Sequence, residues 1–73
     1  MSRVAAIGEV RRVAGFALAG VDVYVAESPE AAHAAWSALG EDVGLVVLTP
    51  LAAAGLEGRL SEREDLLWVT LPA

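Results

Sequence analysis

The sequence predicts an α/β domain built on a four-stranded parallel sheet, and three observations carry this prediction. Short apolar runs alternate with segments of helical periodicity along the 73 residues. The run "LVVL" at 45–48 is continuously apolar, as in a parallel strand covered on both faces. Two of the helical segments begin with a hydroxyl residue followed by proline. A chain of this length forms one small domain, so we expect a single domain at 1–73.

The first strand is expected at 3–7, "RVAAI", and Gly8 closes it with a tight turn. A helix follows, with Gly20 as its C-terminal stop. Its apolar positions recur at three- and four-residue spacing and form the predicted buried stripe: Val10, Val13, Ala14 and Ala17, with Leu18 beside them. On a helical wheel Phe16 points away from this stripe, beside Arg12.

The second strand is expected at 21–27, "VDVYVAE". The next three residues predict a helix start in detail. Ser28 supplies a capping hydroxyl, Pro29 stands where its missing N–H costs nothing, and Glu30 lies near the positive end of the helix dipole. The buried stripe of this second helix is expected to be Ala32, Ala35, Trp36 and Leu39.

The third strand is the run at 45–48, and Thr49 with Pro50 repeats the hydroxyl-proline helix start. A third helix is predicted over 51–60. It is expected to be short or frayed, because each glycine in a helix interior costs up to about 1 kcal/mol relative to alanine. Two glycines fall in it: Gly55 and Gly58.

The charged stretch "SERED" at 61–65 is expected to form a loop or single turn, and "LLWVTL" at 66–71 the fourth strand. Right-handed crossovers then give the βαβαβαβ, Rossmann/flavodoxin-like order 2-1-3-4, with the first helix on one face of the sheet and the other two helices on the opposite face. One face is therefore undercovered. We expect the isolated domain to form a homodimer through the bare region of strands three and four, including Trp68.

Composition excludes several classes of function. There is no lysine and no cysteine, and the formal net charge is −5. These counts remove Schiff-base and P-loop lysine chemistry, thiolate metal sites and redox roles, and a basic footprint for nucleic acid or membrane surfaces. The lone His33 cannot form a metal cluster. No signal peptide or membrane span is recognisable, so we expect a cytoplasmic protein. From the composition we expect no catalytic, cofactor-binding or metal-binding residues.

A possible ligand site lies where the first strand ends beside the third, at the switch point of such sheets. The glycine spacing needed for a dinucleotide is absent, because Gly8 is followed by Glu9 and the next glycine is Gly15. Glu9 is interpreted as a partner of the helix dipole and Thr49 as an N-cap. The alternative, a small-molecule or nucleotide-responsive regulatory domain, would use Gly8, Glu9 and Thr49.

Five of the larger side chains bear on partner binding. Arg11 and Arg12 are interpreted as a solvated surface, or as a contact for an acidic partner. Phe16 is either an exposed aromatic that binds a partner or a side chain folded back against the sheet. Trp36 and Trp68 are expected to fill the core, although Trp68 lies on the strand whose face is undercovered.

Four segments together resemble the F component of the V-type and archaeal-type rotary ATPases over essentially the whole chain: "VAAIGE", "VAGFALAGVDVYVAESPEAA", "DVGLVVLT" and "LLWVTLP". The most specific piece is the block Gly15–Val21. It is followed by Ser28-Pro29-Glu30 and by the strand Gly44–Thr49. None of these segments contains a catalytic motif.

The resemblance implies a non-catalytic component of the central stalk, without a cofactor and peripheral to the membrane as part of a V/A-type ATPase complex. Such a component docks on the coiled-coil axle and helps couple ATP turnover in the catalytic head to proton or sodium transport. The first helix then becomes a docking surface. The interface residues that we expect are Arg11, Arg12, Gly15, Phe16 and Trp68.

Two departures from the family pattern limit what is carried over. The loop after the first strand reads "EVRRV", where family members commonly carry an acidic or threonine-containing loop. The resemblance further indicates a short form, because family members continue past the "LP" position into a C-terminal helix that reaches the catalytic head. Ala73 precedes that helix, as a natural short form or a trimmed chain, so the helix's regulatory role is not carried over.

Overall fold

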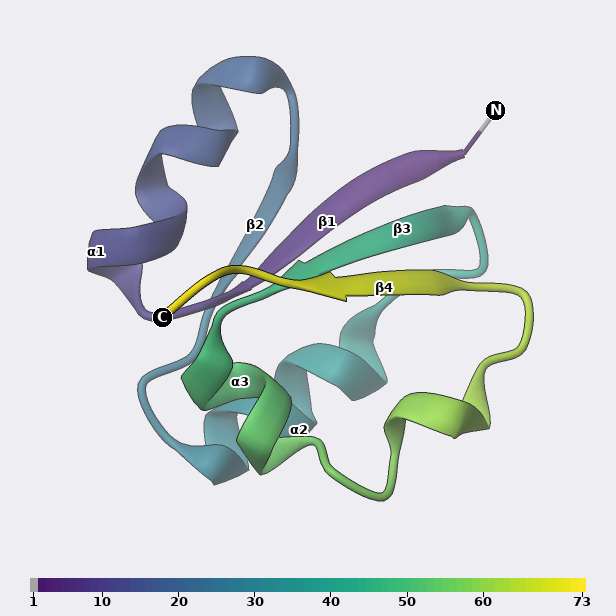
Figure 1. Cartoon of the computed structure of the whole chain (residues 1–73). Helices are drawn as coiled ribbons and strands as arrows, with labels where there is room; N and C mark the ends of the chain where they lie inside the picture. Colours follow the sequence, from purple (N-terminus) through teal and green to yellow (C-terminus); the bar gives the residue numbers. More distant parts are fainter. Residues whose placement is uncertain (1) are drawn as a thin grey trace.

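The computed structural model describes residues 2–73 and contains a four-stranded parallel sheet in the order β2-β1-β3-β4 (Figure 1). The fold predicted from the sequence is confirmed. The strands are β1 (Arg3–Gly8), β2 (Asp22–Val25), β3 (Val43–Leu48) and β4 (Leu67–Thr70). The helical segments are α1 (Val10–Val13), the 3₁₀ helix η1 (Ala14–Ala19), α2 (Pro29–Ala38), α3 (Pro50–Gly55) and the 3₁₀ helix η2 (Leu60–Glu62).

The helices lie on both faces of the sheet, with α1 and η1 on one side and α2 and α3 on the other (Figure 1). The main core lies between the sheet and the second pair. Ile7, Val46 and Leu48 of the strands pack there with Trp36 of α2 and with Leu56, which follows α3. This arrangement confirms the division of helices that right-handed crossovers predict.

Local capping explains where α2 and α3 begin. The hydroxyl of Ser28 accepts a hydrogen bond from the Ala31 N–H at 3.1 Å. The hydroxyl of Thr49 accepts one from the Ala52 N–H at 3.3 Å, and a proline follows each cap. The third helix ends at Gly55, so the prediction of a short helix is confirmed. The charged stretch at 61–65 enters the single turn η2 and continues as a loop up to β4, which confirms the predicted loop or single turn.

The first helix differs from its prediction. It is α-helical for one turn only and continues as a 3₁₀ helix to Gly20, which stops it in the left-handed region at φ 80°. A 3₁₀ helix has about three residues per turn, so positions three apart share a face. Val13 is accordingly buried and Phe16 is half-buried, whereas Leu18 is 95% exposed. The predicted buried stripe through Val10 and Leu18 is therefore wrong, because it assumed a continuous α-helical period.

The face of the sheet that carries α1 and η1 is uncovered at the edge formed by β3 and β4 (Figure 1). Leu45 and Leu67 are register partners in β3 and β4, as are Val46 and Trp68, and neighbouring partners in a sheet point to the same side. Leu67, 73% exposed, therefore lies on the undercovered face, together with Val69. Trp68 shares the face of buried Val46 instead and is 41% exposed. From the sequence, Trp68 was expected to fill the core and was also placed in the bare region of the sheet. Both expectations are wrong, because Trp68 lies at the rim of the covered face.

Candidate functional site

The sheet's switch point, where β1 ends beside β3, is filled by the protein's own side chains. Thr49 is completely buried there, and its hydroxyl donates a hydrogen bond of 2.5 Å to Oε1 of Glu9. A Cβ placed on Gly8 would lie only 2.5 Å from Oγ1 of Thr49, so glycine is required for this approach. The hydrogen bond from Thr49 lowers the pKa of Glu9 below its ordinary value of 4.5.

The first backbone N–H of α1 finds its hydrogen-bond acceptor on a residue that follows the neighbouring strand β2. The N–H of Val10 donates to Oε2 of Glu27 at 2.8 Å, and Glu9 makes no side-chain cap. Glu9 stands at the N-terminus of α1 as expected from the sequence, but its carboxylate is held by Thr49, a contact that was not predicted. The role of Glu27 was not predicted. The adjacency of β1 and β2 is the signal that would have indicated it, since the residues after two neighbouring parallel strands meet at one edge.

A hollow of about 460 Å³ opens beside the start of α1. It is lined by two carboxylates and two guanidinium groups, those of Glu9, Glu27, Arg11 and Arg12. Nη2 of Arg12 donates to the carbonyl of Pro72 at 2.6 Å, which ties the segment after β4 to α1. Arg11 is exposed and forms no ion pair with residues 2–73. The charges around the hollow balance, so it selects neither an anion nor a cation.

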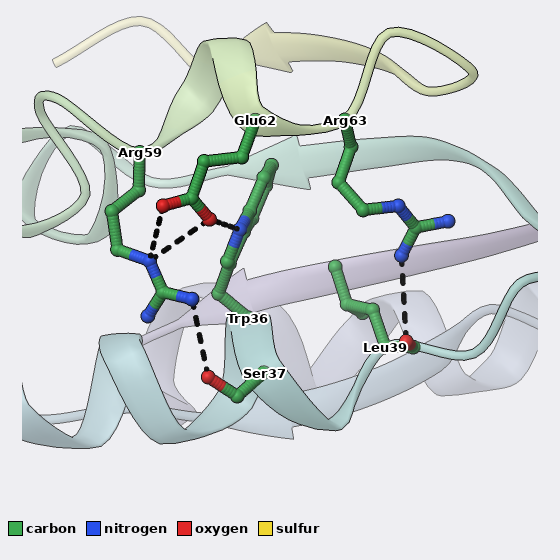
Figure 2. A pocket seen from close by; sticks show the side chains of 6 residues that line it. All are labelled: Trp36, Ser37, Leu39, Arg59, Glu62 and Arg63. Atoms are coloured by element: carbon green, nitrogen blue, oxygen red, sulfur yellow. Dashed lines mark hydrogen bonds and ion pairs between the residues drawn. The ribbon is translucent and has the colours of Figure 1, made fainter.

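A second hollow, of about 400 Å³, lies between α2 and η2 (Figure 2). The indole N–H of buried Trp36 donates to Glu62 at 3.2 Å, and Glu62 is also paired with Arg59 at 3.2 Å. The other guanidinium nitrogens of Arg59 reach His33 and Ser37. Since every nitrogen of Arg59 already has a partner, the cluster acts as a clamp that holds η2 over α2.

Within residues 2–73, no group of three or more histidine, cysteine, aspartate or glutamate side chains is arranged to hold a metal ion. No helix in the described part of the chain is long and apolar enough to cross a bilayer.

The structure brings four of the five expected interface residues together on the α1–η1 segment. Arg11, Arg12 and Gly15 are exposed there, and Phe16 is half-buried. The fifth, Trp68, lies on β4, at the opposite edge of the sheet from β2, against which η1 packs. The most exposed large apolar side chain of the segment is Leu18, which the α-helical period assigned to the buried stripe. The interruption of the helical pattern by Gly15 was the signal that this helix is irregular.

Comparison with known proteins gives one family. The model of the family described as ATP synthase (F/14-kDa) subunit matches residues 4–72 of the chain. A search of curated proteins finds no match. The match reaches all four strands and both faces of the sheet, including the α1–η1 segment and the corner between Gly8 and Thr49.

Proposed function

Because the chain belongs to the family described as ATP synthase (F/14-kDa) subunit, we propose that it is a non-catalytic component of the central stalk of a V/A-type rotary ATPase. In this role it docks on the coiled-coil axle below the catalytic head and helps couple ATP turnover to proton or sodium transport. It works on the cytoplasmic side, peripheral to the membrane. The observation that carries the proposal is the family match over residues 4–72.

The geometry of the switch point supports a binding role over a ligand-sensing one. Sheets of this topology bind ligands outside the carboxyl ends of the strands where the strand order reverses. Here the contact between Thr49 and Glu9 occupies that position, and Gly8 lets the buried threonine approach closely. A nucleotide-responsive regulator would have to break this contact to admit a phosphate.

The α1–η1 segment is the proposed docking surface for the axle. Leu18, Val10 and Arg11 are exposed on it, with exposed fractions of 95% for Leu18 and 48% for Val10. The flank of a coiled coil carries long charged side chains, glutamates among them. Their aliphatic portions can pack on exposed apolar side chains, and their carboxylates can pair with a neighbouring cation. Burial of a leucine side chain contributes about 1.5–3 kcal/mol, so Leu18 is the expected anchor.

The test is reconstitution of the full chain with the axle protein of the same ATPase, with binding measured by calorimetry. Leu18→Glu is expected to weaken the complex by about tenfold or more, because it removes the buried apolar contact and adds a charge. The matched control is Leu51→Glu, since Leu51 is 41% exposed on α3, on the other face of the sheet. This control is expected to bind as the natural sequence does.

Two results would contradict different parts of the proposal. Absence of any complex between the natural chain and the axle protein would contradict the stalk function. A complex that Leu18→Glu and Leu51→Glu leave equally strong would retain the function and exclude the α1–η1 segment as the docking surface. Phe16→Ala is a poorer probe, because Phe16 is half-buried and its truncation also removes packing within the domain.

A further inference from the structure

Within the described residues 2–73, the segment between α3 and β4, residues 57–65, has no backbone hydrogen bond to α2 or to a strand. Its backbone bonds are local. The Arg59 N–H donates to the Leu56 carbonyl at 2.8 Å, and the Glu62 N–H donates to the Arg59 carbonyl at 3.0 Å. The segment can therefore move without breaking the hydrogen bonds of the sheet.

Polar side chains tether this segment to α2 and to the turn after it, and they are those of Arg59, Glu62 and Arg63 (Figure 2). The donor–acceptor distances are 3.2 to 3.4 Å, at or beyond the long end of the usual range. The partners are side chains and carbonyls of five residues: His33, Trp36, Ser37, Leu39 and Gly40. No single tether therefore holds the segment firmly.

Apolar packing beneath the segment is sparse. The hollow of about 400 Å³ lies between η2 and α2, and side chains that line a void lose dispersion contacts on that side. Leu60 is the only apolar side chain at 57–65, and it is half-buried against the core. The residues that bracket the segment are buried instead, with Leu56 0% and Leu66 5% exposed. The two ends are thus anchored, whereas the middle is held loosely.

One end of the segment contains a residue suited to a hinge. Gly58 has a φ of 92°, in the left-handed region that glycine adopts without strain. A Cβ placed on it would meet nothing within 4 Å, so packing does not require a glycine here. A hinge needs a residue that absorbs a large change of backbone angles, and Gly58 lies two residues after the anchored Leu56.

We infer that residues 57–65 form a lid that opens as a unit while the sheet and α2 stay folded. Opening breaks the hydrogen bond between Trp36 and Glu62 and frees the indole N–H of a side chain that is 3% exposed in the closed state. Segments with few buried apolar contacts open at a lower free energy than the whole domain unfolds. The lid is a conformational device that uncovers the interior beside α2 without loss of the fold, and it is independent of the proposed stalk function.

Hydrogen exchange of the full natural chain, followed by NMR at several low urea concentrations, tests the inference. The Trp36 indole N–H and the Glu62 amide are expected to exchange about tenfold or more faster than the Thr49 amide, after correction for intrinsic rates. The Thr49 N–H donates to the Ile7 carbonyl at 3.1 Å and reports on the sheet. Exchange through the lid is also expected to depend little on urea, because the opening exposes little surface. Equal protection of Trp36 and Thr49, or the same urea dependence, would overturn the inference.

A pair of variants tests whether Glu62 keeps the lid closed. Glu62→Ala removes the acceptor of the Trp36 indole and is expected to speed exchange of that N–H by about fivefold or more, still with little urea dependence. Glu64→Ala is the matched control, since Glu64 is exposed and its side chain makes no hydrogen bond or ion pair within residues 2–73. It is expected to leave the indole rate unchanged. An indole rate that Glu62→Ala and Glu64→Ala alter equally would contradict the assignment of Glu62 as the residue that closes the lid.

Discussion

Replacement of Thr49 by valine tests the closure of the switch point. The change keeps the shape of the side chain and removes a hydroxyl that is completely buried. That hydroxyl caps α3 by accepting from the Ala52 N–H, a contribution of about 1 kcal/mol. It also donates to Glu9, and this bond contributes about 1 kcal/mol more, because the half-exposed carboxylate can turn to water when the donor is lost.

The expected loss is therefore about 2 kcal/mol of the free energy of unfolding. With a urea dependence of about 1 kcal/mol per molar for a domain of this size, the midpoint should fall by about 2 M. Glu9→Gln is the matched control, since its amide oxygen still accepts from Thr49, and its midpoint should fall by less than about 1 M. A midpoint for Thr49→Val within about 0.5 M of the natural sequence would refute the reasoning.

Three further outcomes are expected. Gly8→Ala should lower the free energy of unfolding by about 1–3 kcal/mol in urea titration, because there is no room for a Cβ at this strand end; an unchanged midpoint would contradict this. Glu62→Ala should lower it by roughly 1 kcal/mol and alter tryptophan fluorescence, because the buried Trp36 indole loses its acceptor. Arg3 lowers the pKa of Asp22 below 3.8, so this pair stabilises the fold above that pH and the contribution is lost as the pH falls below it. Acid titration of Arg3→Gln should show a weaker pH dependence there.

The sheet was predictable because its determinants are local. Each strand is a short apolar run, and each of the two hydroxyl-proline pairs caps a helix in the way that its side chain dictates. The fourth-strand prediction at 66–71 contains the observed β4, and the short third helix follows from its glycines. Strand order then follows from the handedness of crossovers, which holds independently of side-chain detail.

The misplaced residues share one physical cause: their positions depend on geometry that a fixed period does not describe. Leu18 is exposed where burial was predicted, because a 3₁₀ turn rotates each residue by about 120° instead of 100°. The same rotation half-buries Phe16, for which the sequence left both placements open. Trp68 was assigned by its strand, whereas its face is decided by register with Val46. The partner of Glu9 was missed because Thr49 is distant in sequence and reaches it only where β1 and β3 end together.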